Sequence, residues 1–501
     1  MKKVYIFSIL IIPIILTYFI YSKKMELNKS VNYSNNFDQI LETSLTKINM
    51  SIRDLHSSEV DKIGGGLFTL RNNLIFFTRT GKFFYIKNDE VLEDKKLSLN
   101  LGIENLDDNF KLSHSTFRLH KVIFSESCNC LFATHDYFNS KTKLPEFRLS
   151  TLDLSNNENK LWKVLFSSEP IITDSYVSAA GGGGLIQDGN FLYIAIGDYN
   201  MDGVFNKDYE FNKGYIASQD QNGSFGKIYK FDLTNFKYHK IVSGLRNPQS
   251  LFFDQNDGLS LVQHGPQGGD NLIFVKYDKN YGWPYQTEGT EYGKYSWPKK
   301  NTTHTYEKAD FYFVPSIGPS AHIKVKDFYD SWQDNYLITS LKSRTLYRLM
   351  VDDKKIKYVE PIFIGHKMRA IVEHDQRIYI LTDNHKLLEL KINPSNVNNL
   401  HKIYASMHRC VNCHSFNNYN KSFNGPPLNS ILRNVASLSE FNYSEYLLKY
   451  KKSGLTWNAN LLKKFLNHDY PFSEKENHHI KIDDLHEIDL YVDLLLKETT
   501  N

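Results

Sequence analysis

The stretch Asn190-Phe191-Leu192-Tyr193-Ile194-Ala195 joins a turn residue to an extended apolar run, and the same arrangement occurs five more times in the chain. Apolar runs that are bounded by turn residues and lack helical periodicity are typical of β-strands. The six copies lie at 72–77, 130–134, 190–195, 257–261, 335–339 and 377–381. Their spacing of roughly 40 to 80 residues predicts a six-bladed β-propeller, because six units over about 330 residues exceed the usual size of a β-sandwich.

The chain is long enough for two or three domains, since 501 residues exceed what one ordinary core organises. We expect a mainly β protein, with a six-bladed β-propeller followed by a small all-α domain and preceded by a transmembrane anchor. The expected parts are an anchor at 1–24, a linker at 25–60 with some helix from Phe37 to Ile52, the propeller at 61–396 and the all-α domain at 400–498. The net charge of +4 is small for this length and indicates no nucleic-acid partner.

Four cysteines are too few for a disulfide framework. Cys128 and Cys130 are two residues apart, and a bridge at that spacing on a strand would be strained, so we expect free thiols there. The other two cysteines belong to the segment Cys410-Val411-Asn412-Cys413-His414, which has the C-x-x-C-H pattern of covalent c-type haem attachment.

In this pattern Cys410 and Cys413 add to the haem vinyl groups, and His414 becomes the proximal ligand of the iron. The alternatives are a structural cysteine pair, a zinc half-site and a thioredoxin-like redox motif. The sequence contains no second C-x-x-C segment, and no βαβ pattern surrounds this one. The motif therefore predicts one covalently bound haem c.

The residues that follow the motif resemble class I, mitochondrial-type cytochrome c. The matching segments include Gly425-Pro426-Pro427-Leu428 and Gly454-Leu455-Thr456-Trp457, and a helical run over 485–496 closes the domain. The resemblance implies that Pro426 supports the proximal histidine and that Trp457 lies near a haem propionate. An ordinary core aromatic would explain Trp457 equally well.

The distal side of the haem departs from that family, which usually binds iron with a methionine. No methionine follows Met407, and counting from Trp457 places His478 at the ligand position, with His479 as the alternative. Bis-histidine ligation predicts a lower reduction potential than His/Met ligation, because the thioether raises it. If the two histidines form a surface pair instead, the iron is five-coordinate or takes another ligand.

The N-terminus predicts attachment to a membrane. The 18 residues from Val4 to Tyr21 are almost wholly apolar and are flanked by lysines. As a helix they span about 27 Å, close to the thickness of a hydrocarbon core. Because no Ala-x-Ala-like cleavage site follows, the sequence favours an uncleaved signal anchor over a cleaved signal peptide. Covalent haem attachment is expected outside the bacterial cytoplasm, so we expect the rest of the chain on the periplasmic side of the inner membrane.

Three segments of the propeller region carry a second resemblance. They are Gly244-Leu245-Arg246-Asn247-Pro248-Gln249, the stretch 263–271, and Asn280-Tyr281-Gly282-Trp283-Pro284. This region, from about 60 to 395, resembles the soluble quinoprotein sugar dehydrogenases of the glucose/sorbosone dehydrogenase family. The resemblance implies a six-bladed propeller that carries pyrroloquinoline quinone (PQQ) and calcium.

The resemblance also implies which side chains hold the cofactor. PQQ carries several carboxylates, so its pocket requires fixed cations, and a guanidinium pairs with a carboxylate in bidentate fashion. Arg246, Lys342 and Arg369 fall at family positions that contact PQQ, and Arg246 also contacts substrate. A surface or inter-blade ion pair is the alternative for each.

The calcium site implied by the family falls on Gly265, Pro266 and Asp270. Calcium takes oxygen ligands, including backbone carbonyls. The acidic residue that usually follows the aspartate is Asn271 here. Losing one carboxylate weakens a metal site, so the sequence leaves calcium binding in doubt.

The general base of the family is missing from its usual place. The family has a histidine just before a Gly-Gly-Arg-Leu segment, and this chain has Ala180 at the histidine position and Gly184 at the arginine position. Losing a general base typically costs about 10²- to 10⁴-fold in rate. His264, His114 and Asp198 are candidates to replace it, and the sequence favours none of them.

These observations favour an enzyme, a PQQ-dependent sugar or alcohol dehydrogenase that passes electrons to its own haem c and then to a downstream respiratory acceptor. The alternative is a catalytically altered propeller that binds a glycan or a protein beside an electron-transfer cytochrome. A third hypothesis, haem-based sensing, depends on whether His478 or His479 binds the iron.

Overall fold

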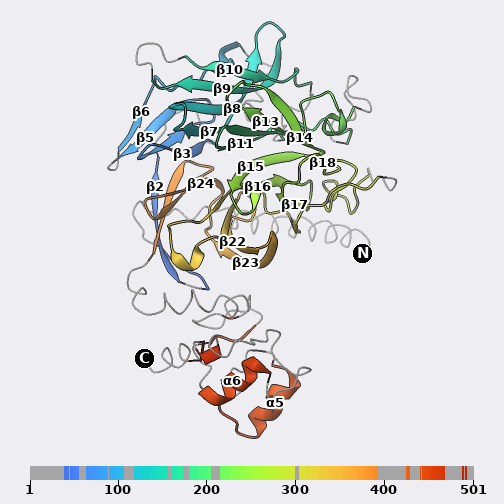
Figure 1. Cartoon of the computed structure of the whole chain (residues 1–501). Coiled ribbons are helices and arrows are strands. Elements are labelled where there is room, and N and C mark those ends of the chain that lie inside the picture. The colour runs from blue at the N-terminus through green and yellow to red at the C-terminus, as the bar shows by residue number, and fades with distance from the viewer. Residues whose placement is uncertain are drawn as a thin grey trace, which may run out of the picture. The chain divides into compact units, whose positions relative to one another are not determined.

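Six sheets of four or five strands form the body of the protein (Figure 1). The computed structural model describes residues 39–44, 46–55, 64–87, 90–105, 118–155, 161–172, 180–204, 215–298, 304–392, 414, 425–428, 441, 443–468, 488–489 and 491–492. In each sheet, consecutive strands are joined mainly as antiparallel hairpins, which is the arrangement of a propeller blade.

The first three sheets in chain order are β3 (Gly66–Leu70), β4 (Asn73–Phe77), β5 (Phe83–Lys87), β6 (Glu90–Glu93); β7 (Leu119–Ser125), β8 (Cys130–Asn139), β9 (Leu144–Asp153), β10 (Lys163–Ser167); and β11 (Gly182–Asp188), β12 (Phe191–Ile196), β13 (Lys227–Asp232), β14 (Tyr238–Ser243), β18 (Lys279–Asn280). The next three are β15 (Asn247–Asp254), β16 (Gly258–His264), β17 (Asp270–Phe274), β19 (Phe311–Phe313); β20 (Pro319–Lys324), β21 (Tyr336–Ser340), β22 (Thr345–Asp352), β23 (Lys355–Phe363); and β24 (Met368–His374), β25 (Arg377–Thr382), β26 (Lys386–Ile392) with β2 (Lys47–Asp54) and β1 (Gln39–Glu42). Short 3₁₀ turns are η1 (Ile103–Asn105), η3 (Ala217–Gln219) and η4 (Asp330–Trp332).

The six-bladed prediction is confirmed, and each predicted repeat corresponds to the second strand of a blade. These strands are β4, β8, β12, β16, β21 and β25. A second strand packs between neighbouring blades, so both of its faces are covered. In β21 every residue from Tyr336 to Ser340 is buried, which explains why these runs are continuously apolar.

The first strands of the blades form a closed ring, because each of them contacts the first strand of the next blade. In ring order they are β3, β7, β11, β15, β20 and β24, and β24 contacts β3 again. Their first residues therefore converge at one end of the propeller axis. This convergence is what positions the candidate site.

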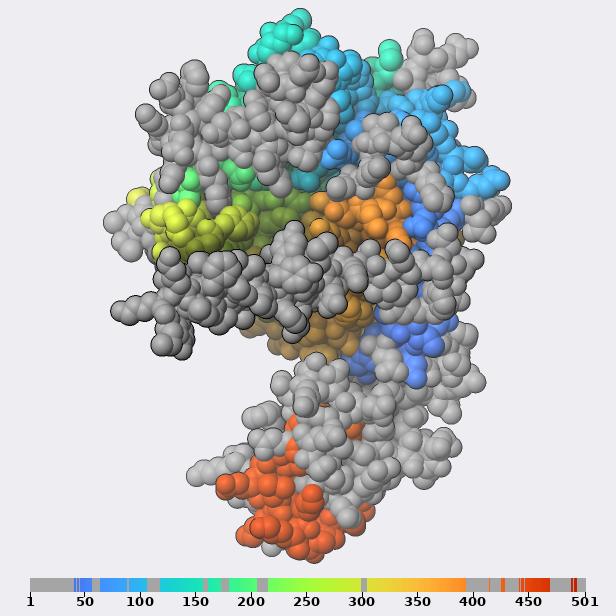
Figure 2. All heavy atoms as spheres, turned by 180° about the vertical axis from the view of Figure 1, so that it is seen from behind, coloured from blue at the N-terminus to red at the C-terminus, as the bar shows by residue number. Residues whose placement is uncertain are grey.

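The last blade is closed by strands from the N-terminal side of the propeller. β2 pairs antiparallel with β26, and Met50 lies opposite Leu390. Figure 2 shows the blue N-terminal strands next to the orange strands of this blade. The expected helix over Phe37–Ile52 is wrong for the described residues, and the linker expected at 25–60 includes two propeller strands. The side chains of 48, 50 and 52 are apolar and alternate with polar ones, which is the period of a strand.

Cys128 and Cys130 form a disulfide, so the expectation of free thiols is wrong. That expectation assumed a pair on one strand, but Cys128 lies in the turn before β8 and Asn129 has a φ of +49°. The left-handed residue brings the two Cα atoms to 5.2 Å, within the usual range for a bridge.

The C-terminal segment contains two described helices, α5 (Glu445–Lys452) and α6 (Ala459–Asn467). Ser444 caps the first helix and Asn458 the second, each accepting a hydrogen bond from a backbone N–H three residues on. Residues 488, 489, 491 and 492 are also helical and fall inside the predicted run at 485–496. The N-terminal anchor expected at 1–24 lies outside the described residues, among which no helix is long and apolar enough to cross a membrane.

Candidate functional site

A cavity lies where the first residues of the six inner strands converge. It has about 550 Å³ of empty space, which includes space open to solvent. Every blade contributes to its lining: Gly65, Leu119, Gly182, Gln249, Ser320 and Arg369 lie at the starts of the six inner strands. We refer to it as the axial cavity.

The axial cavity is lined by three arginines, Arg79, Arg118 and Arg369. Arg369 donates from Nε to Asp383 Oδ1 at 2.5 Å, which fixes its guanidinium at the cavity wall. Burial lowers the pKa of Arg118, and the neighbouring positive charge of Arg369 lowers it further. A buried cluster of like charges binds a ligand with several negative charges, because such a ligand offsets the repulsion.

A histidine and a carboxylate stand beside these arginines. His120, the second residue of β7, also lines the cavity, and its Nε2 lies 3.0 Å from Asp136 Oδ1. Tyr199 donates from its hydroxyl to the same oxygen at 2.6 Å. Burial opposes the charge on Asp136, but His120, Tyr199 and Arg118 outweigh it and lower the pKa of this carboxyl. Asp136 is therefore an anion at neutral pH.

Sequence reasoning missed Arg118, His120 and Asp136. Arg118 and His120 alternate with an apolar residue, which would put both on one face if the segment is a strand, and this alternation was a signal in the sequence. Nothing in the sequence shows that this face borders the axial cavity, because that depends on which strand of the blade is innermost.

Arg246 lines a second cavity, together with His264 and Trp283. Its Nη1 donates to the Gly265 carbonyl at 2.8 Å, and its guanidinium lies 5.3 Å from the centre of the Trp283 ring. The three expected cations therefore do not all line one cavity. Arg369 borders the axial cavity, Arg246 the second cavity, and Lys342 neither of them.

Two of the candidate bases are held in structural roles. His264 has both ring nitrogens engaged, with Pro319 O at 2.8 Å from Nε2 and Asn247 Nδ2 at 3.2 Å from Nδ1. Burial lowers the pKa of His264 to about 4. Asp198 is fully buried and accepts from Trp283 Nε1 at 2.5 Å, and burial raises the pKa of this carboxyl to about 8. His114 lies outside the described residues.

A family model described as Glucose / Sorbosone dehydrogenase matches residues 119–389, more than half of the chain. The chain belongs to the glucose/sorbosone dehydrogenase family. Aldose sugar dehydrogenase YliI of Escherichia coli (strain K12) is 29% identical over 225 residues, which make up 43% of this chain and 60% of that relative. The chain thus spans less than two thirds of this curated relative's length.

Two solved structures share the fold. The crystal structure of the soluble aldose sugar dehydrogenase from Escherichia coli in the apo-form superposes with a TM-score of 0.56 at 20% identity, covering 69% of this chain and 100% of that chain. A crystal structure of glucose dehydrogenase gives a TM-score of 0.54 at 20% identity, covering 68% and 99%. At this identity the likeness shows the propeller architecture.

The loop that the family resemblance assigns to calcium is held by protein donors in this chain. Arg246 donates to the Gly265 carbonyl, and the Ser316 hydroxyl donates to the Pro266 carbonyl at 3.3 Å. The Asp270 carboxylate accepts hydrogen bonds of 2.7 to 3.2 Å from Gly265 N, Ile317 N, Gly318 N and Ser316 Oγ. Across the part of the chain that the structure describes, no group of three or more His, Cys, Asp or Glu side chains is placed to hold a metal ion. These residues do not fit calcium, and we derive no step through it.

Ala180, which the resemblance places at the family's histidine position, is a buried residue before an inner strand. Ala180 is 2% exposed and precedes β11, whose first residues are Gly182, Gly183 and Gly184. The glycines lie against neighbouring strands: a Cβ added to Gly183 would stand 2.2 Å from the Cβ of His120. Most of the glycine run at 181–184 therefore lies within a strand.

In the C-terminal segment, His414 is oriented by its neighbours. The Pro426 carbonyl lies 2.7 Å from its Nδ1, so Nδ1–H is the donor. Gly425 packs against the same ring, since a Cβ added there would stand 2.4 Å from Cε1. Trp457 is half-buried and packs edge-on against Phe465, with ring centres 5.1 Å apart. Cys410, Cys413, His478 and His479 lie outside the described residues.

Proposed function

We propose that this protein is a quinoprotein sugar dehydrogenase that passes electrons from PQQ to a haem c bound covalently in the same chain. The observation that carries the proposal is the arginine-lined axial cavity in a propeller of the glucose/sorbosone dehydrogenase family, in a chain that also contains the CVNCH motif. The substrate class is a sugar or a related alcohol, as the name of the curated relative suggests.

The residues of the axial cavity fit a polycarboxylate cofactor. Arg79, Arg118 and Arg369 would hold its carboxylates, and Asp383 keeps the Arg369 guanidinium in place. When bound, PQQ supplies an ortho-quinone that accepts a hydride from the carbon being oxidised. The protein contributes by holding the sugar, excluding water and accepting the hydroxyl proton.

The residues around His414 fit a haem. The ring of a proximal histidine is oriented by a hydrogen bond from the nitrogen that does not bind iron, and the hydrogen bond from Nδ1 to the Pro426 carbonyl provides such an orientation. Gly425 leaves room for the imidazole, because any side chain there would collide with it. Trp457 remains a candidate for packing near the haem, and His478 or His479 for the distal ligand.

The expected location follows from the haem. We place the propeller and the haem segment in the periplasm, with Val4–Tyr21 as an anchor in the inner membrane and a respiratory acceptor downstream. A fused cytochrome makes the second redox partner intramolecular, with an effective concentration on the order of millimolar.

The test is to produce the chain with haem maturation, load it with PQQ and supply aldoses with an artificial electron acceptor. We expect a Soret band that survives denaturation, and sugar oxidation that requires PQQ. A chain that carries no covalent haem, or that neither retains PQQ nor oxidises any sugar, would contradict the proposal.

A binding module beside an electron-transfer cytochrome is the second candidate, and Ala180 is the observation that favours it. A propeller without catalysis would bind a glycan or a protein and would transfer no electrons to its haem. Glycan binding measured without PQQ, combined with absent turnover in its presence, would favour this candidate over the enzyme.

A further inference from the structure

We propose that His120 on β7 is the general base of this propeller and that Asp136 is its positioning residue. The inference rests on the proposed sugar oxidation. An alanine at position 180 cannot accept a proton. The inference therefore assigns the proton acceptor to a different blade, where the His120 side chain on the inner strand β7 lines the axial cavity.

The hydrogen bonds around His120 define its tautomer. Nε2 lies 3.0 Å from the Asp136 carboxylate and therefore carries the proton, while Nδ1 accepts from Arg118 Nε at 3.0 Å. The lone pair of Nδ1 is thus the basic site of the neutral ring. Asp136 is fixed in turn by the Tyr199 hydroxyl and by the backbone N–H of Arg118. A base that is oriented by a carboxylate, itself oriented by a third group, is the arrangement that acid–base catalysis requires.

The neighbouring blade is shaped around this histidine. A Cβ on Gly183 would stand 2.2 Å from His120 Cβ and 2.9 Å from His120 Nδ1, and the φ of Gly183 is +103°. A Cβ on Gly181 would stand 2.9 Å from the Tyr199 hydroxyl. The two glycines therefore leave the space that the ring and its supporting hydroxyl occupy. β11, which follows Ala180, therefore leaves space for His120 at Gly183.

Arg118 provides the exchange that the reaction needs. In this structure its Nε–H donates to His120 Nδ1. When substrate enters the axial cavity, its hydroxyl replaces Nε–H as the donor to Nδ1, and the Arg118 guanidinium pairs with an anionic ligand instead. The O–H bond then breaks and its proton goes to Nδ1. The hydride, with two electrons, leaves the substrate carbon for the quinone oxidant, so the alcohol carbon is oxidised to a carbonyl and the quinone is reduced. Asp136 stabilises the imidazolium that forms.

Three other histidines of the described propeller have different hydrogen-bond partners. His264 bonds to the Pro319 carbonyl and Asn247, and His322 bonds to Ser250 and Ser260. His135 bonds to Ser150 through Nε2 and to the Asp136 backbone carbonyl through Nδ1. The charges of Asp270 and Asp136 act on His264 and His135, but these hydrogen bonds join the rings to neutral groups, whereas His120 bonds directly to the Asp136 carboxylate.

The inference is tested with His120→Gln, Asp136→Asn and a matched control, His322→Gln, which also removes a buried imidazole. In the PQQ-loaded full chain, we expect His120→Gln to lower kcat for sugar oxidation by about 10²- to 10⁴-fold, while PQQ affinity in a fluorescence titration changes less than about threefold. The control should retain the wild-type kcat.

A second measurement does not depend on turnover. In the apo-protein labelled with ¹⁵N-histidine, NMR should show His120 as a neutral ring protonated on Nε2. The charged and titratable groups that face it are Arg118, Asp136 and His135. Burial lowers the pKa of His120 against the effect of Asp136, so Asp136→Asn should lower it further and shift the acid limb of kcat to lower pH. A ring that is protonated on Nδ1 would overturn the assignment.

A rescue experiment guards against a variant that fails to fold. His120→Gly should be inactive, and adding free imidazole should raise its kcat at least about tenfold, because a small base can occupy the space that the His120 side chain leaves. Full activity in His120→Gln, or no rescue by imidazole in a folded His120→Gly variant, would overturn the inference alone. A wild-type chain that oxidises no sugar would overturn the proposed function and the inference with it.

Discussion

At the scale of single residues, Arg369 shows how the axial cavity fixes a charge. Its ion pair with Asp383 joins Nε to Oδ1 at 2.5 Å, and the side chain remains 22% exposed, so part of the guanidinium faces the cavity. A bidentate partner for a carboxylate must be held in one orientation before the ligand arrives. Asp383 provides that orientation.

Replacing Arg369 with Gln should therefore lower PQQ affinity by about 10- to 100-fold, since a hydrogen bond to a charged group contributes about 1.5 to 3 kcal/mol. The measurement is a fluorescence titration of the apo-protein. Arg377→Gln is the matched control, because Arg377 pairs with Glu389 on the surface of the same blade. Equal affinities for the two variants would contradict a cofactor role for Arg369.

Asp270 gives a second prediction at this scale. Its carboxylate joins the loop at Gly265 to the loop at 316–318, so Asp270→Ala leaves several buried backbone donors unsatisfied. We expect the free energy of unfolding to fall by about 2 to 4 kcal/mol in urea denaturation. The carboxylate oxygens that would bind calcium already accept these hydrogen bonds. We therefore expect that neither calcium nor a chelator changes the melting temperature of the wild type. A clear stabilisation by calcium would contradict this assignment.

The only residue of the axial cavity that the sequence predicted was one that the family resemblance assigned to the cofactor. Arg369 was expected from the resemblance and does border the axial cavity, but Arg246 and Lys342 do not join it. His120 was missed because the histidine and its carboxylate lie on adjacent strands and become partners only through the β7–β8 hairpin. Two side chains that become neighbours only through the pairing of two strands do not form a short motif in the sequence.

At the scale of elements, the second strands of the blades were predictable and the N-terminal strands were not. The second strands are covered on both faces and read as continuous apolar runs. β2 is covered mainly on one face, so apolar and polar residues alternate along it. Because the surrounding sequence is polar and rich in Asn, Ser and Lys, this segment was predicted to be a linker with some helix. Its role depends on pairing with β26, more than 300 residues away in sequence, which no local pattern reveals.

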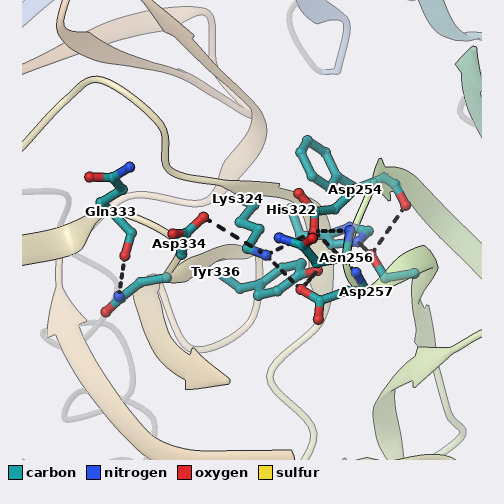
Figure 3. A network of polar contacts seen from close by, with 11 residues as sticks. Asp254, Asn256, Asp257, His322, Lys324, Gln333, Asp334 and Tyr336 are labelled. Atoms are coloured by element: carbon teal, nitrogen blue, oxygen red, sulfur yellow. Dashed lines mark hydrogen bonds and ion pairs between the residues drawn. The ribbon is translucent and has the colours of Figure 1, made fainter. Parts of the chain in front are cut away.

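Contacts between blades depend on a few buried charges, as Figure 3 shows for Lys324. Lys324 Nζ lies 2.9 Å from Asp254 and 2.7 Å from Asp257, which belong to the preceding blade. The Tyr336 hydroxyl donates to Asp257 at 2.9 Å. Lys324 is 7% exposed, so removing it leaves two carboxylates without their counter-charge.

We predict that Lys324→Met lowers the free energy of unfolding by about 3 to 5 kcal/mol, as breaking a buried ion pair does. The control is Lys276→Met, because Lys276 is 58% exposed and its pair with Glu307 should contribute less than about 1 kcal/mol. Urea denaturation at neutral pH measures both. Similar losses in the two variants would show that burial of the pair has no effect.

The same network predicts a pH dependence. Burial raises the pKa of Asp254, but the charge and hydrogen bond of Lys324 and the backbone N–H groups of Asn256 and Asp257 together outweigh it, so the pKa lies below its usual value of 3.8. A carboxyl with a lowered folded pKa stabilises the fold above its unfolded pKa, and this contribution is lost as pH falls through the folded value. The difference in stability between wild type and Lys324→Met should therefore shrink below about pH 4. A difference that stays constant down to pH 2 or so would contradict this linkage.

At the scale of the whole molecule, the ring of six blades is closed by β2. Met50 on this strand is fully buried, whereas Asn49 beside it is only half-buried. Met50→Ala should lower the free energy of unfolding by about 2 to 5 kcal/mol, and Asn49→Ala by less than about 1 kcal/mol. Thermal and urea unfolding of both variants check this. Equal stability of the two would mean that closure of the ring does not depend on this strand.

The expected haem segment and the propeller depend on different signals in the sequence. The C-x-x-C-H motif is local, so the sequence predicts covalent haem directly, and His414 has the hydrogen-bond partner at Pro426 that the cytochrome resemblance implies. The propeller needed six weak repeats read together. Electron exchange between the two parts depends on both of them and is tested on the whole chain.

The central claim is that electrons from sugar reach the haem within one chain. It is tested most directly by stopped-flow absorbance, mixing PQQ-loaded protein containing oxidised haem with an aldose. The haem α-band should appear in a first-order process whose rate constant is independent of protein concentration, because the donor and the acceptor share one chain. A haem that stays oxidised while an artificial acceptor is reduced, or a rate that rises in proportion to protein concentration, would contradict it.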